Sequence, residues 1–218
     1  MSTPSTLNGP MVMPANDRAP TQIVILLHGY GSNGADLISL APHWQAALPG
    51  TVFISPNAPE ICPGAPDGYQ WWGLSSMDPA SRAAGARRAA PLLDAFIDEQ
   101  LARYGLKPKN LALVGFSQGT MMALEVGLRR QPRVAGILGY SGMLADEAGP
   151  ANARSKPPIL LIHGDSDPVL PLAAFHLAGK LLLEAGFDVK GKVSPGLGHS
   201  IDLGGLQLGE EFLRDVLS

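Results

Sequence analysis

The sequence predicts an α/β fold in which helices flank a mostly parallel central sheet. Short apolar runs alternate along the chain with segments whose apolar residues recur every three or four positions, an order that is typical of βαβ units. The apolar runs are continuous, as expected for strands that are buried on both faces of a sheet. Neither a linker nor a break in composition divides the 218 residues. We therefore expect residues 1–218 to form one domain without a large lid domain.

Strands and helices are expected to alternate along most of the chain. The expected strands are the apolar runs Ile23–Leu27, Thr51–Ser55, Leu111–Val114, Val134–Tyr140, Ile159–Ile162 and Phe187–Val193. The expected helices are Ala35–Leu48, Pro79–Tyr104, Gln118–Arg130, Leu172–Ala185 and Leu206–Leu217. The helix that begins at Pro79 has the clearest limits, because Asp78 is a good N-cap and Gly105 suits a helix end.

Two regions lack such periodicity. Residues 1–20 are expected to form a mobile arm or a short edge strand. They carry no early positive charge and no apolar stretch of useful length, so we predict no signal peptide. The segment from Pro56 to Met77 is rich in turn residues and is predicted to be a long loop.

Composition and charge exclude several classes of protein. Hydrophobic residues make up 45% of the chain and charged residues 16%, which fits a globular protein with a sizeable core. The net charge of −3 gives no reason to expect a nucleic-acid partner. The longest apolar runs are too short to span a bilayer, so no stable membrane insertion is expected. The single cysteine, Cys62, gives no disulfide framework and no metal cluster, and it is compatible with a cytoplasmic setting.

The segment Gly115–Gly119 fits the pattern G-x-S-x-G between a predicted strand and a predicted helix. This context is typical of a nucleophile elbow, in which a sharp turn presents the serine hydroxyl above the sheet. The N-terminus of the following helix favours negative charge at Ser117. The alternative is a tight turn with Ser117 as a helix cap, and partners elsewhere in the chain decide between the two.

A serine nucleophile needs a base and an acid, which in this type of fold follow in the order Asp or Glu, then His. His199 lies in a glycine-rich loop after the last strand and is the expected base, whereas His176 lies within a helical pattern. Asp165 and Asp167 both follow the strand that ends at Ile162. We expect Asp165 to bind local backbone N–H groups and Asp167 to orient His199.

Two backbone N–H groups are expected to form an oxyanion hole. One is the N–H of Gln118, the residue after the nucleophile. The other comes from the loop "HGYGSNG" after the first strand, where Tyr30 N–H is our candidate. His28 and Gly29 are expected to shape this turn. A simple strand-ending turn is the alternative.

Several motifs in order resemble those of the phospholipase/carboxylesterase family of α/β-hydrolases, small bacterial esterases similar to acyl-protein thioesterases. The motifs are "LLHGYG" at 26–31, "GFSQGTMMAL" at 115–124, "SGML" at 141–144, "HGDSDPVLP" at 163–171 and "GLGHSI" at 196–201. The resemblance covers the chain from about Ile23 to Leu217. It implies an α/β-hydrolase fold. It also supports Asp167, because the second aspartate of the acid loop is catalytic in the family.

The resemblance further implies a serine carboxylesterase for short- to medium-chain acyl esters, with no metal or cofactor. A short loop with "GYQWWGLSSMDP" takes the place of a lid, and Trp72 and Leu74 are candidates for an acyl pocket. Trp72 could equally be loop core. Val169 and Met143 are further pocket candidates. Tyr30 stands where relatives often have leucine, so the chain-length preference of relatives does not carry over.

Alternatives to a carboxylesterase remain at this point. A dienelactone-hydrolase-like enzyme would prefer a cysteine in the elbow, where this chain has Ser117. An acyl-protein or small-molecule thioesterase, or a lysophospholipase, would use the same triad. A catalytically silent binding protein would not need the full set of motifs. Apolar surface around Trp71–Leu74 could serve a substrate, a lipid or a homodimer.

Overall fold

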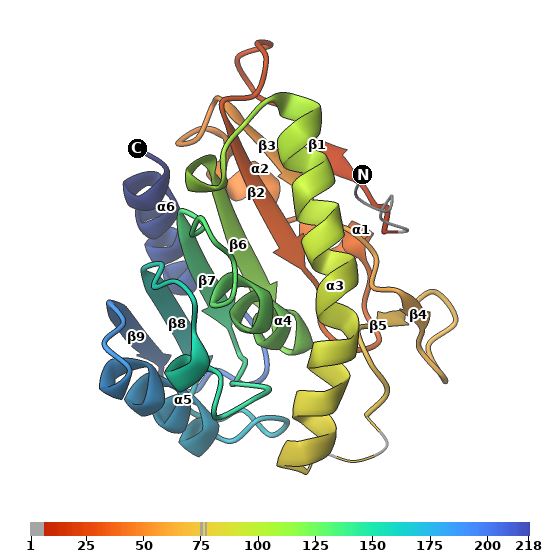
Figure 1. The fold of residues 1–218 in the computed structure, drawn as a ribbon, viewed down its shortest axis with the longest axis vertical. Helices are drawn as coiled ribbons and strands as arrows, with labels where there is room; N and C mark the ends of the chain where they lie inside the picture. The colour runs from red at the N-terminus through yellow and green to blue at the C-terminus, as the bar shows by residue number, and fades with distance from the viewer. Residues whose placement is uncertain (1–6, 75, 77) are drawn as a thin grey trace.

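A seven-stranded sheet runs through the centre of the protein (Figure 1). The computed structural model describes residues 7–74, 76 and 78–218. The strands, in their order across the sheet, are β1 (Met11–Val12), β3 (Thr51–Ile54), β2 (Gln22–Leu27), β6 (Leu111–Phe116), β7 (Gly136–Tyr140), β8 (Ile159–Gly164) and β9 (Val189–Ser194). Only β1 is antiparallel to its neighbour, which confirms the mostly parallel sheet.

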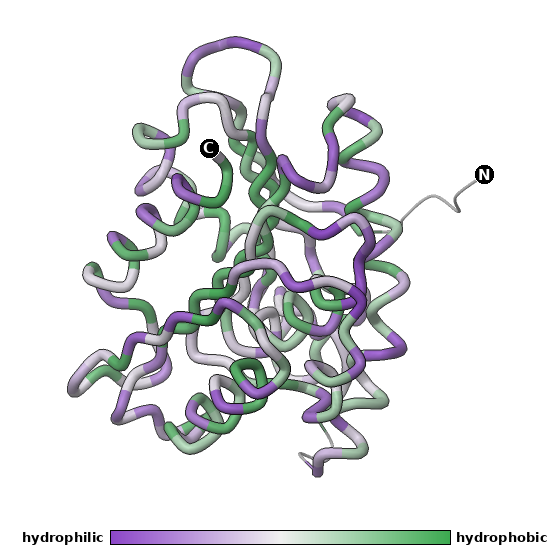
Figure 2. Tube along the Cα trace, turned by 60° about the vertical axis from the view of Figure 1, so that its left-hand side comes forward, coloured by the Kyte–Doolittle hydropathy of each residue, from purple (hydrophilic) through white to green (hydrophobic). Residues whose placement is uncertain are grey.

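Helices cover both faces of the sheet (Figure 1). One face carries α3 (Pro79–Tyr104), α4 (Gln118–Gly127) and α5 (Leu172–Glu184), and the other carries α1 (Gly34–Ile38), α2 (Ala41–Gln45) and α6 (Leu203–Leu217). Because successive strand residues point to opposite faces, Ile23 and Ile25 join the core under α3 and α4, while Val24 and Leu26 join the core under α6. Figure 2 shows the hydrophobic stretches running through the middle of the molecule.

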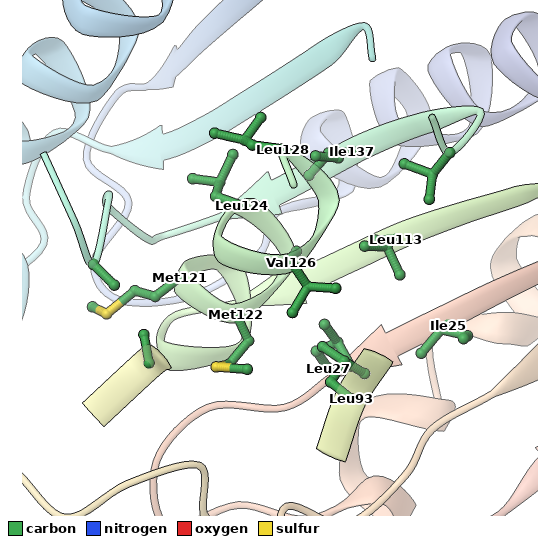
Figure 3. Close-up of a cluster of buried hydrophobic side chains, with 14 of the residues drawn as sticks. Ile25, Leu27, Leu93, Leu113, Met121, Met122, Leu124, Val126, Leu128 and Ile137 are labelled. Carbon is green, nitrogen blue, oxygen red and sulfur yellow. The ribbon is translucent and has the colours of Figure 1, made fainter. Parts of the chain in front are cut away.

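The helix α4 is buried along its whole length. Met122 and Val126 belong to the same apolar cluster as Leu27 of β2 and Leu93 of α3 (Figure 3). A Cβ on Gly127 would lie 2.5 Å from Cδ1 of Ile137, so a side chain there would require the Ile137 side chain to move. The close packing fixes the position of the turn that leads from β6 into α4.

The predicted helix Ala35–Leu48 is wrong, because the segment forms two short helices, α1 and α2, separated at Ser39 and Leu40. Pro42 accounts for the break: a proline within a continuous helix has no N–H to donate, and its ring clashes with the carbonyl four residues earlier. Asn33 caps α1 by accepting a hydrogen bond from Asp36 N–H at 2.9 Å.

Other elements differ from the expectation in extent. The predicted long loop contains a small antiparallel hairpin of β4 (Glu60–Ile61) and β5 (Tyr69–Gln70). The last helix begins at Leu203 and not at Leu206, because Asp202 caps it by accepting a hydrogen bond from Gly205 N–H. Two 3₁₀ turns lie at Pro108–Asn110 and Pro150–Asn152. Residues 11 and 12 form the edge strand β1, while residues 1–6 of the expected arm and Ser75 and Met77 of the loop lie outside the described residues.

Within the described ranges, none of the helices combines the length and the apolar character that crossing a bilayer requires.

Candidate active site

The loops that follow β2, β6, β8 and β9 meet beyond the carboxyl ends of these strands, which is where open parallel sheets bind their ligands. They surround a cavity of ≈ 420 Å³. Its lining consists of Tyr30, Leu74, Ser117, Gln118, Met121, Val169, Leu170 and His199. The structure therefore brings the predicted nucleophile, base and oxyanion-loop residues to one place.

Ser117 lies in a strained turn between β6 and α4. Its φ is 54° and its ψ is −117°, a conformation that costs a residue other than glycine on the order of 1–3 kcal/mol. The flanking glycines make the turn possible. A Cβ on Gly119 would lie 1.8 Å from the carbonyl oxygen of Leu27, and a Cβ on Gly115 would lie 2.4 Å from Thr120 N. The two glycines thus let the strand, the turn and the oxyanion loop pack against one another.

Both carboxylate oxygens of Asp167 accept hydrogen bonds. Oδ2 lies 2.7 Å from Nδ1 of His199, and Oδ1 accepts from the N–H groups of Val169 at 2.8 Å and Leu170 at 2.9 Å. Burial raises the pKa of Asp167, but the hydrogen bonds from Leu170, His199 and Val169 outweigh it, so the pKa lies below its usual range. Asp167 is therefore held as a carboxylate that faces the imidazole.

The loop that carries His199 is fastened to the neighbouring strand ends. Ser141 Oγ donates to the carbonyl of Ser200 at 3.1 Å, and the ring of Phe116 lies 5.0 Å from that of His199. Asp165 Oδ1 accepts a hydrogen bond from Gly196 N–H at 2.7 Å. Asp165 thus binds a backbone N–H as expected, but that N–H is in the histidine loop and not in its own turn.

His28 holds the loop after β2 that carries Tyr30. Ala58 N–H donates to its Nε2 at 2.9 Å, so the ring hydrogen is on Nδ1, which lies 2.7 Å from the carbonyl oxygen of Gly29. Burial lowers the pKa of His28, which favours this neutral form. The Gly29 carbonyl and the Tyr30 N–H belong to one trans peptide and point in opposite directions. By holding the carbonyl, His28 sets the direction of the Tyr30 N–H.

The side chain of Gln118 has a structural role that the sequence did not reveal. Its Oε1 accepts a hydrogen bond from Trp71 N–H at 2.9 Å, and its Nε2 donates to the carbonyl of Trp72 at 2.9 Å. Trp71 Nε1 in turn donates to the carbonyl of His28 at 3.0 Å. The turn at Ser117, the loop after β2 and the segment before Leu74 are therefore tied together by buried hydrogen bonds.

Comparison with known proteins assigns this arrangement to a family. The sequence profile of the phospholipase/carboxylesterase family matches residues 7–217. The chain belongs to the phospholipase/carboxylesterase family.

Relatives within the family include esterases and thioesterases. Acyl-protein thioesterase 1 of Gibberella zeae is 32% identical over 226 residues, which cover 95% of this chain and 95% of the relative. Esterase YpfH of Escherichia coli K12 is 29% identical over 204 residues, covering 93% of this chain and 86% of the relative. The crystal structure of esterase PE8 superposes with a TM-score of 0.91 at 44% identity, over 97% of this chain and 99% of the other. The chain is a carboxylic ester hydrolase with the α/β-hydrolase fold.

Two of the four pocket candidates taken from the family resemblance line the cavity. Leu74 and Val169 are in the lining, whereas Trp72 and Met143 are not. Trp72 is 2% exposed and packs on α3, where a Cβ on Gly85 would lie 2.3 Å from its Cδ1. We correct the expectation accordingly: Trp72 is part of the core beneath the loop, and Met143 packs against the same core.

The sequence analysis missed two lining residues, Met121 and Leu170. Met121 stands four positions after Ser117, one helical turn along α4, so the helix period could have revealed it. Leu170 follows Val169 and lies beside the acid. Tyr30 lies at the open side of the cavity with 40% exposure, and a hydrogen bond with the Cys62 thiol raises the pKa of its hydroxyl.

Other candidate sites lie apart from this cavity. His176 is exposed on α5, with its ring at the edge of Phe175. A larger hollow of ≈ 580 Å³ lies among α6, β8 and β9 near Arg133, Lys190 and Asp215, and it shares no lining residue with the cavity at Ser117. In the part of the chain that the structure describes, no group of three or more His, Cys, Asp or Glu residues is arranged to hold a metal ion.

Proposed function

We propose that the protein hydrolyses short- to medium-chain acyl esters through an acyl-enzyme on Ser117, with His199 as the base and Asp167 as the acid that orients it. The observation that carries the proposal is the 2.7 Å contact between His199 Nδ1 and Asp167 Oδ2, made by a histidine that lines the same cavity as Ser117. A hydroxyl is a weak nucleophile at neutral pH and needs such a base.

The first half-reaction acylates Ser117. His199 Nε2 takes the hydroxyl proton while Oγ attacks the carbonyl carbon of the ester, and the imidazolium that forms is stabilised by the ionised Asp167. The tetrahedral intermediate then collapses, the bond to the leaving alcohol breaks, and His199 gives the proton to the alcohol oxygen. Asp167 keeps its charge throughout, in accord with its lowered pKa.

The second half-reaction releases the acid. Water loses a proton to His199 and attacks the acyl carbon, and the collapse of the second intermediate returns the proton to Ser117 Oγ. In both steps the negative oxygen is proposed to accept hydrogen bonds from the backbone N–H groups of Tyr30 and Gln118. Each such donor is typically worth about 10²–10³ in turnover, or roughly 2.7–4 kcal/mol.

The walls of the cavity suit an acyl chain. Leu74, Met121, Val169 and Leu170 present apolar side chains beside Ser117, and burial of each methylene of a substrate contributes about 0.8 kcal/mol to binding. The cavity is open to solvent at Tyr30 and Val169, which are 40% and 60% exposed. We therefore expect the rate to rise as the acyl chain lengthens until the chain passes this opening.

Thioester hydrolysis is the second candidate activity. The triad and oxyanion donors would act in the same way on a thioester, and a relative named acyl-protein thioesterase 1 is 32% identical over 95% of both chains. The leaving group is then a thiol, which His199 would protonate as it would an alcohol.

A series of p-nitrophenyl esters of rising acyl length, with one matched acyl thioester beside them, tests the proposal. We expect kcat/KM to pass through a maximum in the short- to medium-chain range and to be higher for the ester than for the matched thioester. A higher kcat/KM for the thioester would favour the second candidate activity, thioester hydrolysis.

Replacement of Ser117 by alanine is the chemical control. Since removal of the nucleophile of a triad leaves only binding and oxyanion stabilisation, we expect a loss of about 10⁶-fold in kcat. Labelling by a fluorophosphonate and the burst of p-nitrophenol should both disappear. Turnover that survives in Ser117→Ala would show that another group is the nucleophile.

A further inference from the structure

We infer that His163 is a positioning residue for Asp167, an inference that rests on the proposed role of Asp167 as the acid of the triad. His163 is the second-last residue of β8 and four positions before Asp167. It is 1% exposed, and the mechanism proposed above does not use it.

The contacts of His163 hold the turn that carries the acid. Nε2 lies 2.9 Å from the carbonyl oxygen of Leu170 and 3.4 Å from Oδ2 of Asp167. Leu170 also donates its N–H to Oδ1 of the same carboxylate at 2.9 Å. One ring nitrogen therefore fastens the far end of the 167–170 turn to the end of β8, and Leu170 transmits this position to Asp167.

The hydrogen on the ring of His163 can be assigned from these contacts. The carbonyl of Leu170 only accepts hydrogen bonds, so Nε2 carries the hydrogen. Nδ1 has no hydrogen-bond partner among the described residues, and a buried N–H without an acceptor would cost on the order of 1–3 kcal/mol. The side chain of Phe175 covers the ring, with the ring centroids 5.8 Å apart.

The consequence is that Oδ2 of Asp167 faces two imidazoles from two different strand ends. His199 Nδ1 is in direct contact at 2.7 Å, and the Nε2–H of His163 lies at the longer distance of 3.4 Å on the buried side. Packing alone does not require a histidine here, because the rest of β8 up to this point, Ile159–Ile162, consists of apolar residues. The donor at Nε2 is the property that an apolar residue would lack.

Two amide variants separate this role from packing. In His163→Gln the side-chain nitrogen can reach the place of Nε2, whereas in His163→Asn it reaches only the place of Nδ1, where there is no partner. We expect His163→Asn to lose roughly tenfold or more in kcat, as for a lost buried hydrogen bond, with KM little changed, and His163→Gln to recover most of the rate. The far-downfield proton resonance of the Nδ1–H between His199 and Asp167 should weaken in His163→Asn and persist in His163→Gln.

The outcomes distinguish this inference from the proposed function. If the wild type is not labelled at Ser117 by a fluorophosphonate, the proposed function fails. If the wild type is labelled but both variants keep the wild-type kcat, or lose it equally with an unchanged downfield resonance, the positioning role fails. Should His163→Asn not fold, nitrogen-15 spectra of the histidines in the wild type still decide, because a hydrogen on Nδ1 of His163 overturns the inference.

Discussion

The two halves of the site are held in different ways. The half with the proposed nucleophile, at the ends of β2 and β6, is fixed mainly by close contact of main chains, together with the buried amide of Gln118. Gly119 lies against the carbonyl of Leu27, where even a Cβ would be 1.8 Å away. The half with the proposed acid and base, at the ends of β8 and β9, has one such contact, where a Cβ on Gly164 would lie 2.1 Å from the carbonyl oxygen of Leu197. It is further fixed by side chains that bind the main chain, such as Asp165 to Gly196 and Ser141 to Ser200.

This difference follows from the position of each half in the sheet. β2 and β6 are central strands with neighbours on both sides, whereas β9 is the last strand of the sheet and is half-exposed. In the centre, packing density leaves no freedom. Because the chain has fewer neighbours at the edge, individual hydrogen bonds contribute more to holding the loops there. We therefore expect the central half to be most sensitive to substitutions that add volume. The edge half should be most sensitive to substitutions that remove a hydrogen-bond donor or acceptor.

Apart from removal of the proposed nucleophile itself, the largest effect is expected from Asp167→Asn in the edge half. An amide keeps the shape of the side chain but no longer stabilises the imidazolium of His199, and such a change typically lowers kcat by about 10⁴, or roughly 5.5 kcal/mol. Asp165→Asn in the same loop is the matched control and should cost only a few-fold, because Gly196 N–H can still find an amide oxygen. Comparable losses in both variants would show that Asp167 acts only as a loop residue.

The pH dependence of stability adds a second measurement for Asp167→Asn. The pKa of Asp167 is lower in the folded state than its usual value of 3.8, so its contribution to the free energy of unfolding is present above that pH. The contribution is lost as the pH falls through the folded-state pKa. The asparagine variant should therefore lose less stability than the wild type on acidification below about 3.8.

The next largest effect is expected from Gly119→Ala in the central half. The new methyl group would overlap backbone atoms of Leu27 and His28, and overpacking against a rigid main chain should cost about 3 kcal/mol or more of stability. Gly179→Ala on α5 is the matched control, since a Cβ there meets nothing within 4 Å. It should stabilise the fold by about 0.4–1 kcal/mol. Chemical denaturation measures both, and equal responses would contradict the argument from volume.

A smaller effect is expected from changes at His28, whose side chain orients the Gly29–Tyr30 peptide in the central half. His28→Asn places an amide N–H near the position of Nδ1 and keeps the bond to the carbonyl of Gly29. His28→Gln reaches Ala58 but leaves that carbonyl free. We expect kcat of His28→Gln to be lower than that of His28→Asn by about 10–100-fold, part of the value of one oxyanion donor. Equal kcat values of the two variants at equal stability would show that His28 does not orient the Tyr30 N–H.

Most of the sheet could be predicted from the sequence because buried parallel strands are continuous apolar runs, as in Ile23–Leu27 and Ile159–Ile162. The helix over Ala35–Leu48 could not, since its apolar spacing continues through Pro42 and only the backbone chemistry of proline ends it. The hairpin Glu60–Gln70 was also missed, because its two strands of two residues are too short to show a period.

The candidate site was predictable to the extent that motifs encode it. Ser117, Asp167 and His199 stand in glycine-rich loops at recognisable spacings, and the structure brings them together, while their catalytic roles remain a proposal. The place of Trp72 stayed open between pocket and loop core, because aromatic residues in a loop look alike in sequence whether they face a cavity or the core. The small residue that receives Trp72, Gly85, lies on another element. His163 was passed over for a similar reason: its partner is the main-chain carbonyl of Leu170, and a main-chain contact leaves no mark in the sequence.

The amide of Gln118 has a consequence for attempts to redesign substrate preference. The backbone N–H of Gln118 is proposed to bind the oxyanion. Its side chain binds the main chain of Trp71 and Trp72, and Trp72 is two positions before Leu74 in the cavity wall. A library at position 118 would therefore change the acyl wall and the charged intermediate at once. Libraries at Leu74 and Val169 would leave the elbow intact, which makes these two positions the better place to begin an evolution of chain-length selectivity.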